Sequence, residues 1–143
     1  MDKKLFFQNL IHFIGTVHAS THFLMKNARS DEITPQQHSI LEYIFFNKAV
    51  TTSQVADCLN ISLPNASREL KKLLNLELIV KVVNNKDRRT NTIRLSVQGQ
   101  NLMHRTFERI EKNFWERSGE MSEKEMKAII SSIKILEKKI FIP

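Results

Sequence analysis

The sequence contains little glycine, proline or cysteine. Three glycines and three prolines in 143 residues are too few for a disordered linker or for a fold rich in β-turns. So few glycines cannot form a Gly-rich phosphate-binding loop, and no nucleophile motif is present, so we expect no enzymatic activity and no cofactor. The single cysteine, Cys58, excludes a disulfide within the chain and is typical of a reducing compartment.

Long apolar runs are also absent. Lys3 and Lys4 precede an apolar stretch, but Gln8, Asn9 and His12 interrupt it and no small-x-small cleavage pattern follows. No run approaches the roughly 20 apolar residues that a membrane-spanning helix requires. We therefore expect a cytoplasmic protein that does not enter a membrane.

What the chain does have is enough apolar material for one core, at 41%, and an excess of basic residues that gives a net charge of +7. Residues 1–60 carry five basic and five acidic residues and are neutral. Residues 61–97 carry eight basic and three acidic residues (net +5), and residues 98–143 carry nine and seven (net +2). The positive charge is therefore concentrated in the middle of the chain, which favours a polyanionic partner.

The spacing of apolar residues predicts long helices at both ends of the chain. Residues 5–28 have an apolar face so wide that we expect it to contact more than its own domain. A second helical pattern runs from Gln98 to a stop at Gly119, and the capping box Ser122-x-x-Glu125 opens a last helix that continues to Ile140.

Three further helix starts lie between these ends. Thr34-Pro35-Gln36-Gln37 and Thr51-x-x-Gln54 are capping boxes, and Ser62-x-x-Asn65 begins a third helix after a tight turn at Asn60-Ile61. Two short helices joined by a tight turn predict a helix-turn-helix.

The pattern then becomes strand-like. Residues 78–83 are rich in β-branched side chains, and Ile93, Leu95 and Val97 alternate with polar residues. The polar, basic loop of residues 84–91 is longer than a tight hairpin needs, which indicates contact with something outside the chain. The whole order predicts a mainly α protein with a small β-hairpin, a winged helix-turn-helix.

In such a fold the second helix of the motif enters the major groove of DNA. Its early polar positions supply the groups that base edges and phosphates bind, and the basic loop has the length and charge to reach a minor groove. We interpret Asp87 as a local partner that orients an arginine. The predicted DNA-binding residues are Ser62, Asn65, Ser67, Arg68, Lys71, Lys72, Lys86, Asp87, Arg88 and Arg89.

One motif carries a family resemblance. Asp87-Arg88-Arg89, five residues, Leu95-Ser96, two residues and Gly99 resembles the wing signature of the MarR family of bacterial regulators. Ser96 stands where the family usually has Thr. Glu77 stands where it usually has Gly, so we expect either that Asn75 ends the preceding helix or that this helix ends differently.

The resemblance covers essentially the whole chain, residues 1–143, and implies a transcriptional regulator. It implies a winged helix at residues 33–97, and dimerisation helices at residues 5–30 and 100–143 that interlock in a homodimer. It also implies double-stranded DNA with a palindromic site as the partner, and usually repression that a small molecule or an oxidant relieves. The position of an effector pocket is not readable from the sequence.

Two alternatives stay open. His18 and His22 lie four residues apart on the first helix, and His38 and His104 lie on helices that could approach them, so a zinc-responsive regulator of the same fold is one alternative. Without a nearby cysteine or dense carboxylate set, however, packing or exposed histidines are the simpler interpretation, as a small structural residue is for Cys58. A winged-helix module for protein–protein contact is the second alternative.

Overall fold

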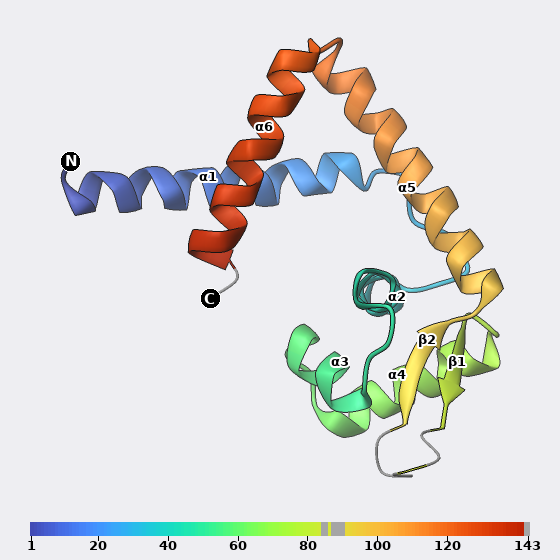
Figure 1. The fold of residues 1–143 in the computed structure, drawn as a ribbon. Helices are drawn as coiled ribbons and strands as arrows, with labels where there is room; N and C mark the ends of the chain where they lie inside the picture. The colour runs from blue at the N-terminus through green and yellow to red at the C-terminus, as the bar shows by residue number, and fades with distance from the viewer. Residues whose placement is uncertain (84–85, 87–90, 142–143) are drawn as a thin grey trace.

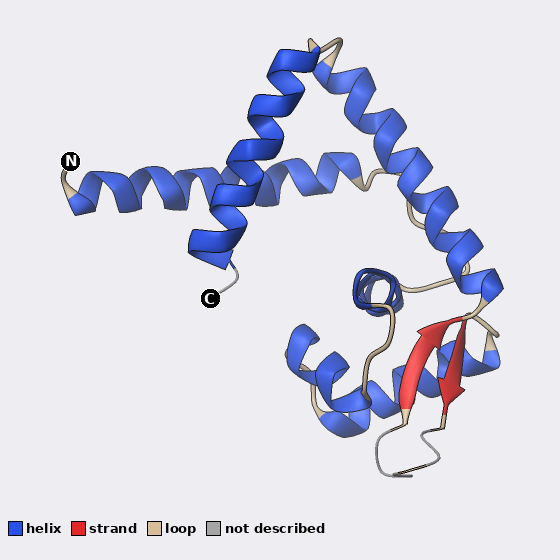
Figure 2. Cartoon of the chain, in the orientation of Figure 1, coloured by secondary structure: helices blue, strands red, loops and turns tan. Residues whose placement is uncertain are grey.

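The computed structural model describes residues 1–83, 86 and 91–141 and is mainly helical, with one antiparallel hairpin, as the sequence predicts (Figures 1 and 2). Within these residues, no helix has both the length and the apolarity needed to cross a membrane. The elements are α1 (Lys3–Leu24), α2 (Pro35–Asn47), α3 (Thr52–Leu59), α4 (Leu63–Asn75), β1 (Ile79–Val82), β2 (Thr92–Leu95), α5 (Val97–Ser118), α6 (Glu123–Leu136) and the short π-helix η1 (Glu137–Phe141).

The chain divides into a compact unit and extended helices. Helices α2, α3 and α4 pack with the hairpin, and α5 leads away from them toward α6, which turns back across α1 (Figure 1). The core lies in the compact unit and the first part of α5, whereas neither α1 nor α6 has a buried residue. The largest fully buried apolar side chains are Ile40, Leu41, Ile44, Val50, Val55, Leu73, Ile93 and Met103.

Helix starts follow the predicted capping signals. Thr34, Thr51 and Ser122 each accept a hydrogen bond from the third residue of their helix, and the side chain of that residue accepts one from the cap in return. These hydrogen bonds from Ser122 also lower the pKa of the Glu125 carboxyl. Ser62 caps α4 by accepting from the backbone of Asn65 at 3.2 Å. The sequence therefore predicts the starts of these helices correctly.

The end of α1 is set by a contact with α5. The helix stops at Leu24, earlier than predicted, and the chain turns through Asn27 at a φ of 57°. The Asn113 side chain of α5 donates to the carbonyl oxygens of Leu24 and Lys26, both at 2.9 Å. It thereby satisfies acceptors that a helix end leaves without a partner.

Helix α4 ends differently from the pattern that a glycine would produce. Glu77 itself adopts the left-handed conformation, with a φ of 58°, so Asn75 does not take that role. The backbone N–H of Leu78 donates to the carbonyl of Leu73, and that of Glu77 donates to Leu74. This is the Schellman motif, formed here around a glutamate where glycine carries no steric cost.

The start of α5 is locked onto this turn. The Ser96 hydroxyl donates to the Glu77 carbonyl at 2.6 Å and accepts from the backbone N–H of Gly99 at 3.0 Å. A Cβ on Gly99 would lie 2.0 Å from the carbonyl oxygen of Leu78, so only glycine fits there. The Leu-Ser-x-x-Gly part of the motif therefore holds α4, the hairpin and α5 together.

We expect Glu77→Gly to stabilise the protein. Glycine removes the steric cost of a left-handed residue but adds chain entropy to the unfolded state, which leaves a net gain of about 0.5–1 kcal/mol. Urea denaturation measures the free energy of unfolding. Glu108→Gly, at an exposed position within α5, is the matched control and should lose about 1 kcal/mol. Destabilisation by Glu77→Gly would contradict this account of the helix end.

Candidate nucleic-acid interface

Helix α4 has one buried side and one polar, exposed side. Ala66, Leu70 and Leu73 anchor it in the core. The side that faces solvent carries most of the residues predicted to bind DNA, and Asn65 is half-buried at its edge. The exposed members are Ser62, Ser67, Arg68, Lys71 and Lys72. The structure thus brings the predicted helix residues together on one surface.

The first turn of α4 is also available for contact. Leu63 is half exposed and Pro64 is exposed, at the end of the helix where backbone N–H groups lack intrahelical partners. The Ser62 hydroxyl oxygen accepts a backbone hydrogen bond as the cap, which leaves its proton for an outside acceptor. This end of α4 therefore offers donors and an apolar side chain in the same place.

A buried carboxylate ties α4 to α2, a contact that was not predicted from the sequence. Glu69 is buried, and its carboxylate accepts from the Gln37 amide at 3.2 Å and from the Lys72 ammonium at 3.1 Å. Gln37 also closes the capping box of α2 with Thr34. The sequence does hold one indication that Glu69 is buried, since Glu69 follows Ala66 by one helical turn and so lies on the apolar side of α4. The contact holds Lys72, predicted to bind phosphate, at a defined position.

The hairpin completes the winged arrangement. Strand β1 pairs with β2 in the register Ile79↔Leu95 to Val82↔Thr92, and Ile93 also forms a bridge with Val50. Of the predicted loop residues, Lys86 is described, whereas Asp87, Arg88 and Arg89 lie outside the described residues.

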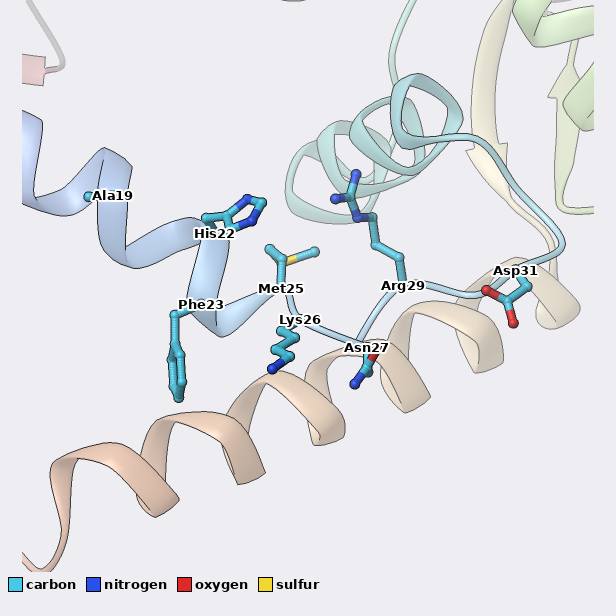
Figure 3. Close-up of a pocket in the computed structure, with 8 residues that line it drawn as sticks. All are labelled: Ala19, His22, Phe23, Met25, Lys26, Asn27, Arg29 and Asp31. Atoms are coloured by element: carbon cyan, nitrogen blue, oxygen red, sulfur yellow. The ribbon is translucent and has the colours of Figure 1, made fainter.

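A cavity of about 480 Å³ lies between α1, α2 and α5. Figure 3 shows an adjoining pocket that shares His22, Met25 and Arg29 with this cavity, and in it His22 and Arg29 project toward α2. On α2, His38 is buried and its Nε2 lies 3.1 Å from the Glu42 carboxylate. The buried Nδ1 of His38 has no hydrogen-bond partner in the described part of the chain. The apolar wall of this cavity includes Leu24, Met25, Phe46, Phe107 and Ile110. The cavity therefore combines ring nitrogens, a guanidinium and an apolar surface.

The predicted metal candidates line this same cavity. His18 and His22 both contribute to it, but the described residues contain no group of three or more His, Cys, Asp or Glu side chains that could hold a metal ion. Cys58 is exposed on α3, at the surface of the helix-turn-helix. The arrangement does not favour the zinc-responsive alternative.

Much of the apolar surface of α1 and α6 is exposed. Phe6, Phe7 and Ile11 are about half exposed on α1, as are Ile130 and Ile133 on α6. An apolar cavity of about 250 Å³, lined by Phe13 and Ile133 among others, separates the two helices. These faces are apolar without being buried in the single chain.

Comparison with known proteins finds a family match in the winged-helix part of the chain. Residues 32–90, which contain the helix-turn-helix and the hairpin up to its loop, match the sequence model of the MarR family. The predicted resemblance to the MarR family is therefore confirmed over this segment. Members are DNA-binding transcriptional regulators, which confirms the predicted class of function and the expectation that the chain is not an enzyme.

Solved structures extend the likeness beyond the matched segment. Transcriptional regulator Tm0710 from Thermotoga maritima is 20% identical with a TM-score of 0.67, and the alignment covers 95% of this chain and 94% of that one. MepR of S. aureus, solved as a point mutant bound to an oligodeoxyribonucleotide, is 20% identical with a TM-score of 0.63, over 94% and 97% of the chains. PcaV of Streptomyces coelicolor, in complex with its natural ligand, is 17% identical with a TM-score of 0.59, over 90% and 91%. Comparison with curated protein sequences found no match. The MarR-type winged-helix fold is therefore confirmed along almost the whole chain.

We expect Glu69→Ala to destabilise the protein by about 1–3 kcal/mol, because it leaves the buried Gln37 amide without its acceptor. Urea denaturation of Glu69→Ala, Gln37→Ala and the double variant measures the coupling between the two side chains. Glu108→Ala on the exposed side of α5 is the control and should change stability by less than about 0.5 kcal/mol. Additive losses in the double variant would show that the contact does not link α2 to α4.

Proposed function

We propose that this protein is a dimeric repressor that binds a pseudo-palindromic operator and is released by a small-molecule effector. The observation that carries the proposal is the exposed polar side of α4. The opposite side of this helix is held in the core by Ala66, Leu70 and Leu73. Because net charge of +5 lies within residues 61–97, phosphate contacts would dominate the affinity.

The side chains of α4 divide into two kinds of contact. Arg68 suits guanine and Asn65 suits adenine, while Ser67 suits either kind of base edge. Leu63, exposed in the first turn, suits the methyl group of thymine. Lys71, Lys72 and the hydroxyl proton of Ser62 suit phosphates, which position the helix without reading sequence.

The loop between β1 and β2 would add a second contact. Lys86, Arg88 and Arg89 carry the positive charge that a narrow minor groove attracts, and Asp87 would orient an arginine. The wing assignment of these residues rests on their motif and on the position of the loop between the two strands.

The dimer would form through α1, α6 and the end of α5. Their exposed aromatic and aliphatic side chains form apolar patches of the kind that mark association surfaces, and a second copy of this chain is the partner that the family implies. Residues 5–30 and 100–143 would then form the dimer, and residues 33–97 would bind DNA. Two recognition helices would contact half-sites about one helical turn apart, roughly 10 bp.

The effector would bind in the cavity between α1, α2 and α5. This cavity joins the helices assigned to the dimer to the winged helix, so a ligand there would change their relative placement. The related PcaV was solved with its natural ligand, and MepR was solved both with ethidium bromide and, as a mutant, with an oligodeoxyribonucleotide. These relatives support a regulator that binds both DNA and small molecules.

Selection of bound fragments from random duplex DNA tests the proposal directly. We expect an enriched palindrome, and we expect Arg68→Ala and Asn65→Ala to relax its sequence at defined positions at a cost of about 1–3 kcal/mol each. Lys71→Ala should instead weaken binding to all DNA sequences alike, and it should lower the slope of log affinity against log salt concentration by about 1. Arg89→Ala should weaken DNA binding and leave the dimer intact.

The controls separate the outcomes. Arg105→Ala, exposed on α5, should bind the selected site like the wild type. If Arg89→Ala binds DNA with unchanged affinity, the assignment of this loop as a DNA-binding wing is wrong. Absence of any enriched, salt-sensitive duplex would favour the protein-interaction module over the repressor.

We expect Ile133→Glu to dissociate the dimer, because it places a charge in the apolar surface between α1 and α6. Sedimentation equilibrium measures the mass, and circular dichroism checks that the winged helix remains folded. Lys134→Ala, exposed on the same helix, should remain dimeric. A monomeric wild type, or a variant as dimeric as the wild type, would contradict the interface.

A further inference from the structure

A second cavity, distinct from the proposed effector cavity, lies where α2, β2 and α5 meet. It has a volume of about 370 Å³ and shares no lining residue with the cavity between α1, α2 and α5. Its volume falls in the lower part of the range of small-molecule sites in proteins. None of its lining residues is among the predicted DNA-binding residues, and Gln100 and His104 lie in the first part of α5, away from the exposed apolar side chains of α1 and α6.

The floor of this cavity is apolar. Ile44 is fully buried, Leu95 is 8% exposed, and both belong to the hydrophobic core. The Phe45 ring lies beside them and meets the His104 ring edge-on, with 5.6 Å between the ring centroids. The floor therefore offers a rigid surface for the apolar body of a ligand.

The rim of the cavity is basic. Lys48 from the end of α2, Arg94 from β2 and His104 from α5 line it together with the Gln100 amide. No acidic side chain lines the cavity, and none of these three groups forms an ion pair with a carboxylate among the described residues. Two permanent positive charges thus face the same space without a protein counter-ion.

The backbone at Lys48 is strained. Its φ of 64° and ψ of −53° place it at the centre of a γ-turn, in which the Ala49 N–H donates to the Asn47 carbonyl at 2.7 Å. This form of the turn is rare and costly for any residue with a Cβ, and glycine adopts it freely. Such strain is typical of functional sites. A lysine at this position is explained if its side chain has a use that glycine lacks.

The cavity lies at the end of the hairpin away from its loop. Leu95 pairs with Ile79 where the hairpin begins, whereas Thr92 pairs with Val82 next to the loop. In Figure 1 this end of the hairpin adjoins the start of α5. The cavity therefore lies at the other end of the hairpin from the loop assigned to DNA, which favours a small molecule over a phosphate of the duplex as its occupant.

We propose that this cavity binds a small organic oxyanion, whose charged head pairs with Lys48 and Arg94 and whose apolar body lies on Phe45, Ile44 and Leu95. His104 and Gln100 donate further hydrogen bonds at the rim. Carboxylates and phosphate esters share this chemistry, and a guanidinium pairs with either through two parallel hydrogen bonds. The proposal does not depend on DNA binding, because the anion is expected to bind the protein in the absence of DNA.

Isothermal titration of the free full-length protein with benzoate, phenyl phosphate and the neutral benzamide tests the proposal. We expect saturable binding of benzoate or phenyl phosphate and none of benzamide, and the stronger of the two identifies the head group. Arg94→Gln should weaken that binding roughly tenfold or more, as expected for the loss of a charged hydrogen-bond donor. Inorganic phosphate should bind more weakly than phenyl phosphate, because it lacks an apolar body.

Lys48→Gly is the decisive variant, since it removes the side chain and relieves the turn at once. We expect the ligand-free variant to have an unchanged or higher Tm, together with loss of the bound anion. Arg105→Gln is the matched control on α5 and should bind like the wild type. Equal binding of benzamide, no saturable binding, or wild-type affinity in both Lys48→Gly and Arg94→Gln would overturn the proposal.

Discussion

The winged-helix unit depends on one close approach, that of the first turn of α5 to the backbone between α4 and β1. Gly99 lies so near the Leu78 carbonyl that no side chain fits between them, and Ser96 bonds to the Glu77 carbonyl from the same turn. The end of α4, the start of the hairpin and the start of α5 are thus held together by direct contacts. We therefore expect a change in the direction of α5 to change the placement of α4.

Both proposed ligand sites border this long helix. Phe107 and Ile110 line the cavity against α1 and α2, and His104 lines the smaller cavity one turn earlier. The rings of Phe45 and Phe46 on α2 pack against Phe107, with centroids 4.9 and 5.7 Å apart, so the two cavities are separated by one aromatic cluster. Because Phe107 is in contact with both rings of α2, we expect a displacement of Phe107 to shift them. A ligand in either cavity would act on the same contact between α2 and α5.

The parts of the fold that depend on local chemistry were predictable from the sequence. Capping residues such as Thr34 and Ser62 select a helix start through hydrogen bonds within three residues, so spacing alone identifies them. The end of α4 was not predictable in this detail, because Glu77 adopts the left-handed conformation that glycine usually takes, and its carbonyl accepts from Ser96, which lies 19 residues away in the sequence.

The candidate site divides in the same way. Helical spacing alone predicts which residues of α4 lie on its exposed side. In the structure, Ser62, Ser67, Arg68, Lys71 and Lys72 are exposed, whereas Ala66, Leu70 and Leu73 are buried. The contact of Glu69 with Gln37 joins residues 32 positions apart in the sequence, and the basic rim joins Lys48, Arg94 and His104 from three elements. No spacing rule connects such residues, since only the packing of α2 against α4, β2 and α5 brings them together.

The exposed ends of the chain place a further constraint on how the protein works. Helix α1 runs for 22 residues without a buried side chain, and α6 for 14. Helices in water gain most of their stability by burying an apolar face against a partner, so such helices depend on a contact outside the single chain. If that contact is a second copy, folding of the ends and association are one equilibrium, and stability rises with protein concentration. The spacing of the two recognition helices then follows from the same apolar surface, which makes operator geometry and dimer stability two consequences of how α1 and α6 pack.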